Sequence, residues 1–407
     1  MIISIAWRNI WRNKLRSLVV ILAVTLGLFG ILFMIAMTNG MVVQKIDASI
    51  NNELSHIQVH DTGFMQDPSL HFCMQNIAEI EKDILQTPGV KAVSTRIKAM
   101  AMASTAATGA GIMINAIDPE TEKQVSRIYR YIIDGDYFGK ETKSAPILIS
   151  QKLATKLKAK LGSRIVVTIQ HTSGELVYGL FRVSGIYKTS NTIYDEPNVF
   201  VKKSDLIALT GFDPENTSEI AILLNNTEET SQVTSLLKNK YPDLSILSWN
   251  ELEPFLAGLS SMMDQMAYLL LIIILIAMAF GIINTMMMAV LERIKEIGML
   301  MAVGMNKKKV FRMIMLETVF LALVGTLAGI IISSVTIYYT GLNGINFSKW
   351  AEGYESWGYS ALVYPKLYFN FYIVMTILVI ITAIISSVYP ARKALKFNPA
   401  VAIREEA

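Results

Sequence analysis

The chain has 407 residues, of which 52% are hydrophobic and only 17% are charged, and its formal net charge is +4. Soluble globular chains carry about 25% charged residues, so a large part of this chain must face lipid. Its one cysteine, Cys73, excludes an internal disulfide, and its four scattered histidines lack zinc-site spacing. We therefore expect no metal site. No catalytic dyad emerges from the sequence either, so we expect no catalytic residues, no cofactor and no enzyme activity in this chain.

Four apolar blocks interrupt a sequence that is otherwise ordinary. A helix needs about 20 apolar residues to cross a bilayer, and each block is long enough. The predicted spans cover residues 18–39, 264–291, 313–340 and 369–390. The first block follows a basic segment, as a signal peptide would, but its apolar run is longer than a signal core. We expect it to be retained as a membrane anchor.

Basic residues in the short connecting segments predict the orientation of the spans. Residues 1–17, 292–312 and 391–407 contain four, six and four Lys and Arg, whereas residues 341–368 contain two. This predicts both termini in the cytoplasm, with residues 341–368 as an outer loop. Residues 40–263 then form an outer domain, in which 21 basic residues face 25 acidic ones.

The outer domain alternates short strands with short helices, which predicts an α+β fold. Strands are expected at 57–60, 112–117, 164–170, 175–183 and 220–224, and helices at 76–86, 150–161, 202–209 and 230–240. Ser150 and Asp118 are interpreted as structural turn residues. Residues 40–49 and 252–266 are expected to continue the first two spans as helical stalks. The predicted fold class is a membrane protein with four transmembrane helices and this domain inserted between the first two.

The pattern of apolar and charged residues over 292–312 predicts a cytoplasmic amphipathic helix. We expect this helix to continue the second span without a break. Its apolar stripe consists of Ile294, Ile297, Leu300 and Met301. One alternative is packing on lipid or on the protein's own bundle, and the other is docking into a partner. Gly298 and Gly304 favour docking, since glycine permits close backbone approach and tight turns. The chain contains no G-x-x-x-x-G-K-[ST] motif, so energy from ATP must come from another chain.

Several segments resemble the MacB/LolC/LolE/FtsX-like permeases of ABC transporters. The resemblance rests on Glu292-Arg-Ile-Lys-Glu-Ile-Gly-Met-Leu-Met-Ala-Val-Gly304, on Tyr389-Pro-Ala-Arg-Lys-Ala394 followed by residues 398–404, on residues 7–17, and on residues 147–154 and 181–187 of the outer domain. These segments occur in the family's order along nearly the whole chain. The outer domain is thereby identified as similar to the MacB-like periplasmic core, and residues 1–17 as similar to the family's cytoplasmic N-terminal helix.

The resemblance implies a bacterial inner-membrane permease that works as a homodimer or heterodimer. Two copies of a separate ATPase would bind ATP and Mg²⁺, and residues 292–304 would be the coupling helix in the ATPase cleft. The residues implied in ATPase coupling are Glu292, Arg293, Glu296, Ile297, Gly298, Met301 and Gly304. Layout favours the lipoprotein-releasing branch, because the 17 residues before the first span leave no room for the fused ATPase of the MacB branch. A MacB-type efflux permease and an FtsX-like regulator of periplasmic enzymes are the alternatives.

In the lipoprotein-releasing branch, the first two spans form a cavity for acyl chains. Flexible apolar residues suit such a cavity, although ordinary lipid-facing or bundle-core roles are equally compatible with them. The candidates are Phe29, Phe33, Met34, Met262, Met263 and Met266. The branch member that recruits a periplasmic chaperone has a proline-bearing hook where this chain has a short hairpin at residues 169–180. This chain is therefore interpreted as a substrate-handling partner in a heterodimer or as a member of a side branch with another cargo.

Overall fold

The computed structural model describes residues 2–12, 14–139 and 144–395, which fall into two compact units. We call the first the helical unit; it comprises Met1–Met41, Ser260–Ile345 and Val363–Ala407. The second, which we call the inserted domain, comprises Val42–Leu259 and Asn346–Leu362. The loop between the third and fourth spans thus contributes residues 346–362 to the inserted domain.

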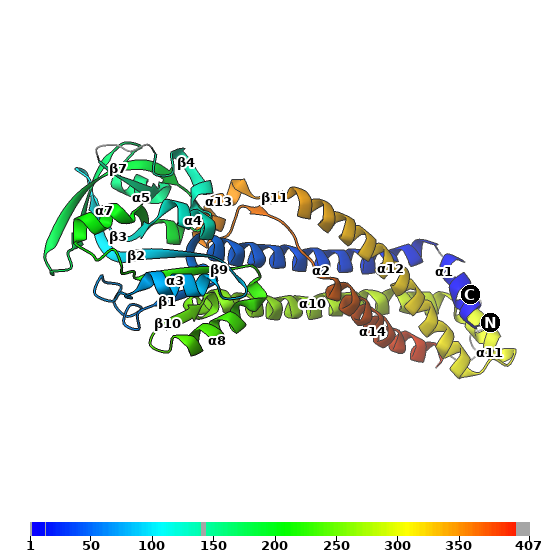
Figure 1. Cartoon of the computed structure of the whole chain (residues 1–407). Helices are drawn as coiled ribbons and strands as arrows, with labels where there is room; N and C mark the ends of the chain where they lie inside the picture. Colours follow the sequence, from blue (N-terminus) through cyan, green and yellow to red (C-terminus); the bar gives the residue numbers. More distant parts are fainter. Residues whose placement is uncertain (1, 13, 140–143, 396–407) are drawn as a thin grey trace. The chain divides into compact units, whose positions relative to one another are not determined.

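The helical unit is built on four long helices that are apolar enough to cross a membrane, which confirms the four predicted spans. The helices of this unit are α1 (Ile2–Arg12), α2 (Lys14–Ser49), α10 (Pro254–Glu292), α11 (Ile294–Ala302), α12 (Lys307–Asn343) and α14 (Phe369–Ala394). Helix α12 packs beside α14 and against α1 (Figure 1). Both α2 and α10 extend well beyond their predicted spans, and they cross the boundary between the two units.

Two glycines of α12 bring its backbone close to α2. A side chain at Gly325 would lie 2.8 Å from Val24 Cβ, and one at Gly329 would lie 3.1 Å from Leu28. Thr25 also donates a hydrogen bond of 3.0 Å to the Gly325 carbonyl. Small residues four apart allow helices to approach closely in a membrane, where packing replaces the hydrophobic effect between helices. This Gly-x-x-x-Gly contact fixes the first span on the third.

A closed ring of six strands forms the centre of the inserted domain. Strand β2 pairs with β3 along its second half and with β6 near its end, and the ring continues through β8, β5 and β7 back to β6. The ring strands are β2 (Val90–Ser104), β3 (Gly109–Ile117), β8 (Asn198–Lys202), β5 (Ala145–Ser150), β7 (Leu176–Tyr187) and β6 (Arg164–Gln170). Alternate inward side chains such as Ile114, Ile147, Val167 and Phe181 fill the barrel.

The first half of β2 carries a small sheet outside the barrel. Strand β9 (Glu219–Leu224) pairs with β2 and with β1 (Ile57–His60), and β1 pairs with β10 (Ser245–Ser248). Helices α3 (Ile77–Leu85) and α8 (Thr230–Lys240) pack their apolar residues on this sheet. The remaining short elements are β4 (Ile132–Gly135), α4 (Pro119–Val125), α5 (Gln151–Leu157), α6 (Thr192–Asp195), α7 (Lys203–Thr210), α9 (Trp249–Leu252), α13 (Ala351–Ser356), β11 (Ile345–Asn346) and β12 (Leu362–Val363).

Every strand and helix predicted for the outer domain is present, with two corrections to helix ends. The helix expected over 150–161 ends at Leu157, because Lys158 adopts a left-handed conformation with φ of 51° and turns the chain toward β6. The stalk expected over 252–266 breaks at Glu253, as the steric demand of the following Pro254 favours. Ser150 and Asp118 are helix N-caps, which confirms their structural interpretation.

Candidate functional site

The segment predicted to dock a partner forms a separate short helix. The prediction that the second span continues through it unbroken was wrong: α10 ends at Glu292, and Arg293 leaves the helical conformation with φ −104° and ψ 18° before α11 begins. Helix α11 ends in a double hydrogen-bonded turn, in which the Gly304 and Met305 amides donate to the Met301 and Leu300 carbonyls. Gly304 makes this turn with φ of +100°.

The break at Arg293 turns its guanidinium toward two carboxylates. Arg293 donates hydrogen bonds of 3.1 and 3.2 Å to both oxygens of Glu317 on α12, and one of 3.1 Å to Glu296 on α11. Ile297 and Gly298, one turn along α11, are buried against the rest of the unit. Arg293, Ile297 and Gly298 therefore position the helix and do not present themselves to a partner.

The two glutamates of the motif are also paired within the chain. Glu296 forms an ion pair with Arg12 of α1, and Glu292 forms one with Arg16 at the start of α2. Both glutamate side chains remain 43% exposed. Sequence reasoning missed Arg12, Arg16 and Glu317 as partners, because nothing in the spacing links residues so far apart.

One face of α11 is left open. Lys295, Met299 and Ala302, at positions i, i+4 and i+7, are exposed, and the Met299 residue is 60% accessible. We call these three residues the outward stripe. Lys295 forms no ion pair with any other residue that the structure describes. Because the opposite side of α11 is held by the chain itself, these three residues are the part of the helix that a partner could contact.

Of the six residues predicted to line an acyl-chain cavity, three are exposed and three are half-buried. Phe29 and Phe33 stack on α2 with ring centroids 5.7 Å apart and are half-buried. Met34, Met262 and Met266 are exposed, and Met263 is half-buried. In the most apolar 18-residue stretch of α10 only 17% of the residues are buried, the smallest share among the four spans. In a single chain these side chains are therefore exposed or half-buried, and they leave accessible apolar surface on α2 and on α10.

The inserted domain contains a buried network of charged side chains that no sequence motif predicted. Arg96 of β2 forms ion pairs with Glu122 (2.7 Å) and Glu219 (2.8 Å), and Lys98 pairs with Glu219 at 2.6 Å. Burial alone would raise the pKa of Glu219, but Lys98 and Arg96 hold it at about 2. Each charged side chain of this cluster has an ion-pair partner within it, which indicates a structural role.

The same cluster fastens the end of the α2 helix to the inserted domain. Residues Ile50–Leu54 continue α2 as a wider π-helical turn. Arg96 donates to the Glu53 carbonyl at 3.3 Å, and the Asn191 amide donates to both Glu53 carboxylate oxygens at 3.0 and 3.1 Å. The Arg127 amide donates to the Asn51 carbonyl at 2.8 Å. Any displacement of this turn is therefore shared with β2, α4 and α6.

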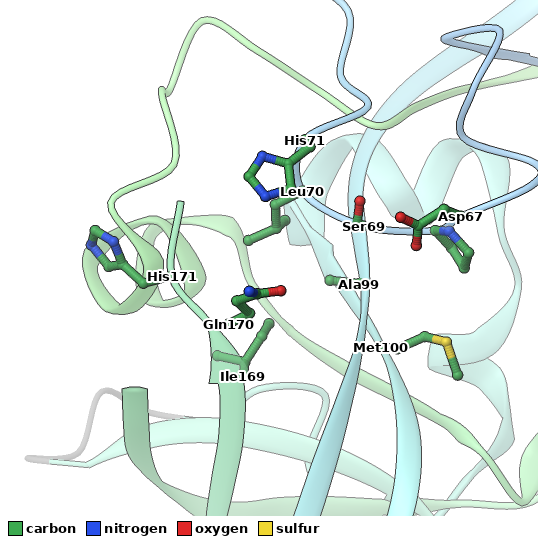
Figure 2. A pocket seen from close by; sticks show the side chains of 10 residues that line it. Asp67, Ser69, Leu70, His71, Ala99, Met100, Ile169, Gln170 and His171 are labelled. Carbon is green, nitrogen blue, oxygen red and sulfur yellow. The ribbon is translucent and has the colours of Figure 1, made fainter. Parts of the chain in front are cut away.

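A pocket of about 160 Å³ lies between the loop at residues 67–71 and the strands β2 and β6 (Figure 2). Two histidines, His71 and His171, line it, but His171 is hydrogen-bonded to Ser173 at 2.9 Å. Within the described residues, no three His, Cys, Asp or Glu side chains come close enough to hold a metal ion. The pocket has neither a nucleophile–base pair nor a ligand set.

The outer wall of the barrel is covered on one side and bare on the other. Near β8 and β5, outward residues such as Phe200 and Leu148 are buried under Ile128 and Phe138. On β2, β6 and β7 six outward side chains are exposed and largely apolar, and we call the surface that they form the bare wall. It consists of Met100, Met102, Val166, Leu176, Tyr178 and Leu180. At its margin Arg164 lies directly opposite Arg182, an arrangement of like charges that favours an acidic partner.

Two family models match the chain and together account for most of its length. The MacB-like periplasmic core domain matches residues 17–240, and the FtsX-like permease C-terminal model matches residues 268–399. A membrane protein with this inserted domain and these spans is a permease of the ABC transporter type. The chain belongs to the MacB/LolC/FtsX-like family of ABC transporter permeases, which confirms the resemblance noted in the sequence.

Relatives of known name differ in length and in the role their names state. ABC transporter permease YtrF of Bacillus subtilis is 31% identical over 56% of this chain and 52% of its own length. Lipoprotein-releasing system transmembrane protein LolE of Haemophilus influenzae is 19% identical over 97% of both chains. Pyoverdine export ATP-binding/permease protein PvdT of Pseudomonas syringae pv. syringae is 23% identical over 99% of this chain and 59% of its own length.

Proposed function

We propose that this chain is the permease subunit of an ABC transporter that extracts lipoproteins from the inner membrane, driven by a separate ATPase that binds α11. The outward stripe is the observation that carries this proposal. Family membership implies an ATPase partner, and α11 offers an open face whose other side is fixed by ion pairs. A helix held in this way transmits a push from a partner to the spans that hold it.

The proposed path of force runs from α11 into the helices that carry the inserted domain. Glu292 pairs with Arg16 at the start of α2, and Arg293 holds α11 on α12. Helix α2 continues unbroken to Ser49, where the Ile50–Leu54 turn is fastened to Arg96 and Asn191. The stalk expected at residues 40–49 is helical throughout, and the one expected at residues 252–266 is helical from Pro254 onward.

Lipoprotein is proposed as cargo because several relatives from lipoprotein-releasing systems align with at least 96% of this chain. The alignments cover 97% of LolE from Haemophilus influenzae and 94% of LolC from Xylella fastidiosa. The accessible apolar surface on α2 and α10 suits acyl chains. The export protein PvdT aligns with 99% of this chain, which supports the efflux alternative.

The ATPase contact is tested by recovery of the ATPase with the tagged chain from its native membrane. Met299→Asp places a charge in the outward stripe, and Met65→Asp places the same charge at an exposed methionine of the inserted domain. We expect Met299→Asp to lower ATPase recovery at least tenfold and Met65→Asp to leave it unchanged. Equal recovery with both variants would refute the assignment of α11.

The cargo is tested by the molecules recovered with the purified complex. Acylated lipoprotein retained by the wild type and released on adding ATP supports lipoprotein extraction. Its absence, with recovery of a periplasmic adaptor and an outer-membrane duct, would favour efflux instead, and recovery of a cell-wall hydrolase would favour the regulatory alternative. ATPase recovery in the same preparation shows whether the complex itself was intact.

The bare wall is proposed to dock a periplasmic protein that accepts or guides the cargo. Its apolar side chains and the facing pair Arg164 and Arg182 suit a partner surface with apolar and acidic residues. Leu180→Asp on this wall and Leu236→Asp on α8 replace leucines of similar exposure, 49% and 45%. Only Leu180→Asp is expected to release the periplasmic partner. If both variants retain it, the wall is not its docking surface.

A further inference from the structure

A groove on the helical unit combines an apolar lining with two cations. It has a volume of about 780 Å³ and runs between the start of α1, the end of α11 and the first turns of α12. Its apolar side chains come from all three helices, and the Val303 residue is 85% exposed. The lining residues used below are Ile3, Ile5, Val303 and Leu316, with Lys309 and Arg312 as the cations. All belong to one unit and none is on the outward stripe.

The two cations and one apolar residue share a face of α12. Lys309, Arg312 and Leu316 stand at i, i+3 and i+7, so their side chains follow one another along the helix. Lys309 and Arg312 are exposed and form no ion pair with any acidic side chain in the described part of the chain. In contrast, Arg12, Arg16 and Arg293 nearby are each paired with a glutamate. The groove therefore has an uncompensated positive charge.

The position of Arg312 along α12 places it at the outer edge of the lipid headgroup layer. The uncharged part of α12 begins at Thr318, six residues after Arg312, which is about 9 Å along a helix. The headgroup layer on each side of a bilayer is roughly 5–8 Å thick. Leu316 then lies at the edge of the hydrocarbon. Trp7 and Trp11, which are exposed on α1, are residues that prefer the same interface.

We propose that this groove binds an anionic phospholipid, with its phosphate between Lys309 and Arg312 and an acyl chain along Ile3, Ile5, Val303 and Leu316. A soluble anion would use the cations and leave the apolar lining exposed. A neutral phospholipid would use the lining and leave the cations without a counter-charge. The bound lipid joins α1, α11 and α12, so it stabilises the arrangement that holds α11 in place.

The full chain, purified in mild detergent, is mixed with equal amounts of phosphatidylglycerol and phosphatidylcholine, and retained lipid is measured by native mass spectrometry. Lys309→Gln/Arg312→Gln removes the two groove cations. Lys307→Gln/Lys308→Gln removes two exposed lysines of the same helix that do not line the groove. We expect the wild type and the second variant to prefer phosphatidylglycerol and the first variant to retain it at least tenfold less.

Three results would overturn this proposal. If Lys307→Gln/Lys308→Gln loses as much phosphatidylglycerol as Lys309→Gln/Arg312→Gln, the lipid is attracted to the basic segment as a whole. If Lys309→Gln/Arg312→Gln retains phosphatidylglycerol fully, the groove cations do not bind the lipid. Displacement of phosphatidylglycerol by inorganic phosphate would point to a soluble anion. Recovery of the ATPase is measured in parallel, so that a loss of ATPase without a loss of lipid assigns the groove to the ATPase contact.

Discussion

The two units of the chain each contain a network of charged side chains, and the networks differ in burial and in purpose. In the inserted domain Arg96 is buried between Glu122 and Glu219, and every member has a partner within the cluster. In the helical unit Arg293 joins Glu296 and Glu317, but Glu292 and Glu296 are partly open to solvent. We call the fully buried network closed and the partly exposed one half-open. The closed network stabilises the fold of its domain, whereas the half-open network holds α11 in position and leaves the outer face of that helix accessible.

Removing the buried arginine is the most severe way to test this comparison. Arg96→Met leaves Glu122 and Glu219 buried beside an apolar side chain, and breaking a buried ion pair costs about 3–5 kcal/mol. We expect the inserted domain to lose stability by this amount in the full chain, measured by pulse proteolysis across a urea series. Arg164→Met, at an exposed arginine, serves as the control. A loss no larger than the control's would contradict the structural role of the network.

Acid is expected to weaken the inserted domain through His56. Its Nδ1 accepts from the Leu224 amide at 3.2 Å and its Nε2 lies 3.0 Å from Thr227 Oγ1, while burial lowers its pKa to about 4. The neutral form is favoured in the fold, so its contribution is full above pH 6.5 and is lost as pH falls through 4. The loss is of order 3 kcal/mol.

The measurement is pulse proteolysis of the full chain between pH 7 and pH 4, with His56→Gln as the comparison. The wild type should lose more stability over this range than the variant, which lacks the titrating ring. Parallel pH dependence in the two proteins would assign acid sensitivity to another group.

Breaking the half-open network should have a smaller effect, confined to α11. Arg293→Met leaves Glu317, which is buried on α12, without its partner, at a cost of about 2 kcal/mol. Hydrogen exchange of α11 amides should then rise roughly thirtyfold. The double variant Arg293→Met/Glu317→Met should restore protection, because no buried charge is left unpaired. If protection stays low in the double variant, Arg293 holds α11 by contacts other than Glu317.

The exposed ion pair between Arg12 and Glu296 is expected to have the smallest effect on stability. Arg12 and Glu296 are 57% and 43% exposed, and ion pairs of this kind contribute less than about 1 kcal/mol. Arg12→Gln should therefore leave exchange of α11 amides within about fivefold of the wild type. A larger increase in exchange would mean that the Arg12–Glu296 pair contributes strongly to the stability of α11. The two networks would then differ less in how much their ion pairs stabilise the protein.

The spans, the insertion of a domain between the first two and most of its short elements were predictable, because hydropathy and local turn signals are read from neighbouring residues. Closure of the barrel was not, since the pairing of β2 with β6 joins residues 102–104 to 166–168 without a local signal. The charge partners Arg12, Arg16 and Glu317 and the Gly325–Gly329 contact were missed for the same reason. The break at Arg293 was missed because helical periodicity continues through it.

For the candidate site, the sequence identified the right segment but not which of its residues face outward. The motif draws attention to Glu292, Arg293 and Glu296, and all three pair with the chain itself. Lys295 and Met299 lie between the motif positions and carry no signal of their own, and the motif does not show that Ala302 faces outward. Their exposure follows from burial of Ile297 and Gly298, which only packing of α11 on its neighbours decides.

The central claim, that the outward stripe of α11 touches the ATPase, is tested most directly by cross-linking in native membranes. Cys73 is the sole cysteine, so Met299→Cys in a Cys73→Ser background places one thiol on the stripe. A short thiol-to-amine cross-linker should join this position to the ATPase subunit, and Leu161→Cys, an exposed site in the inserted domain, should give no such product. A cross-linked ATPase from Leu161→Cys, or none from Met299→Cys in membranes that contain the ATPase, would contradict the claim.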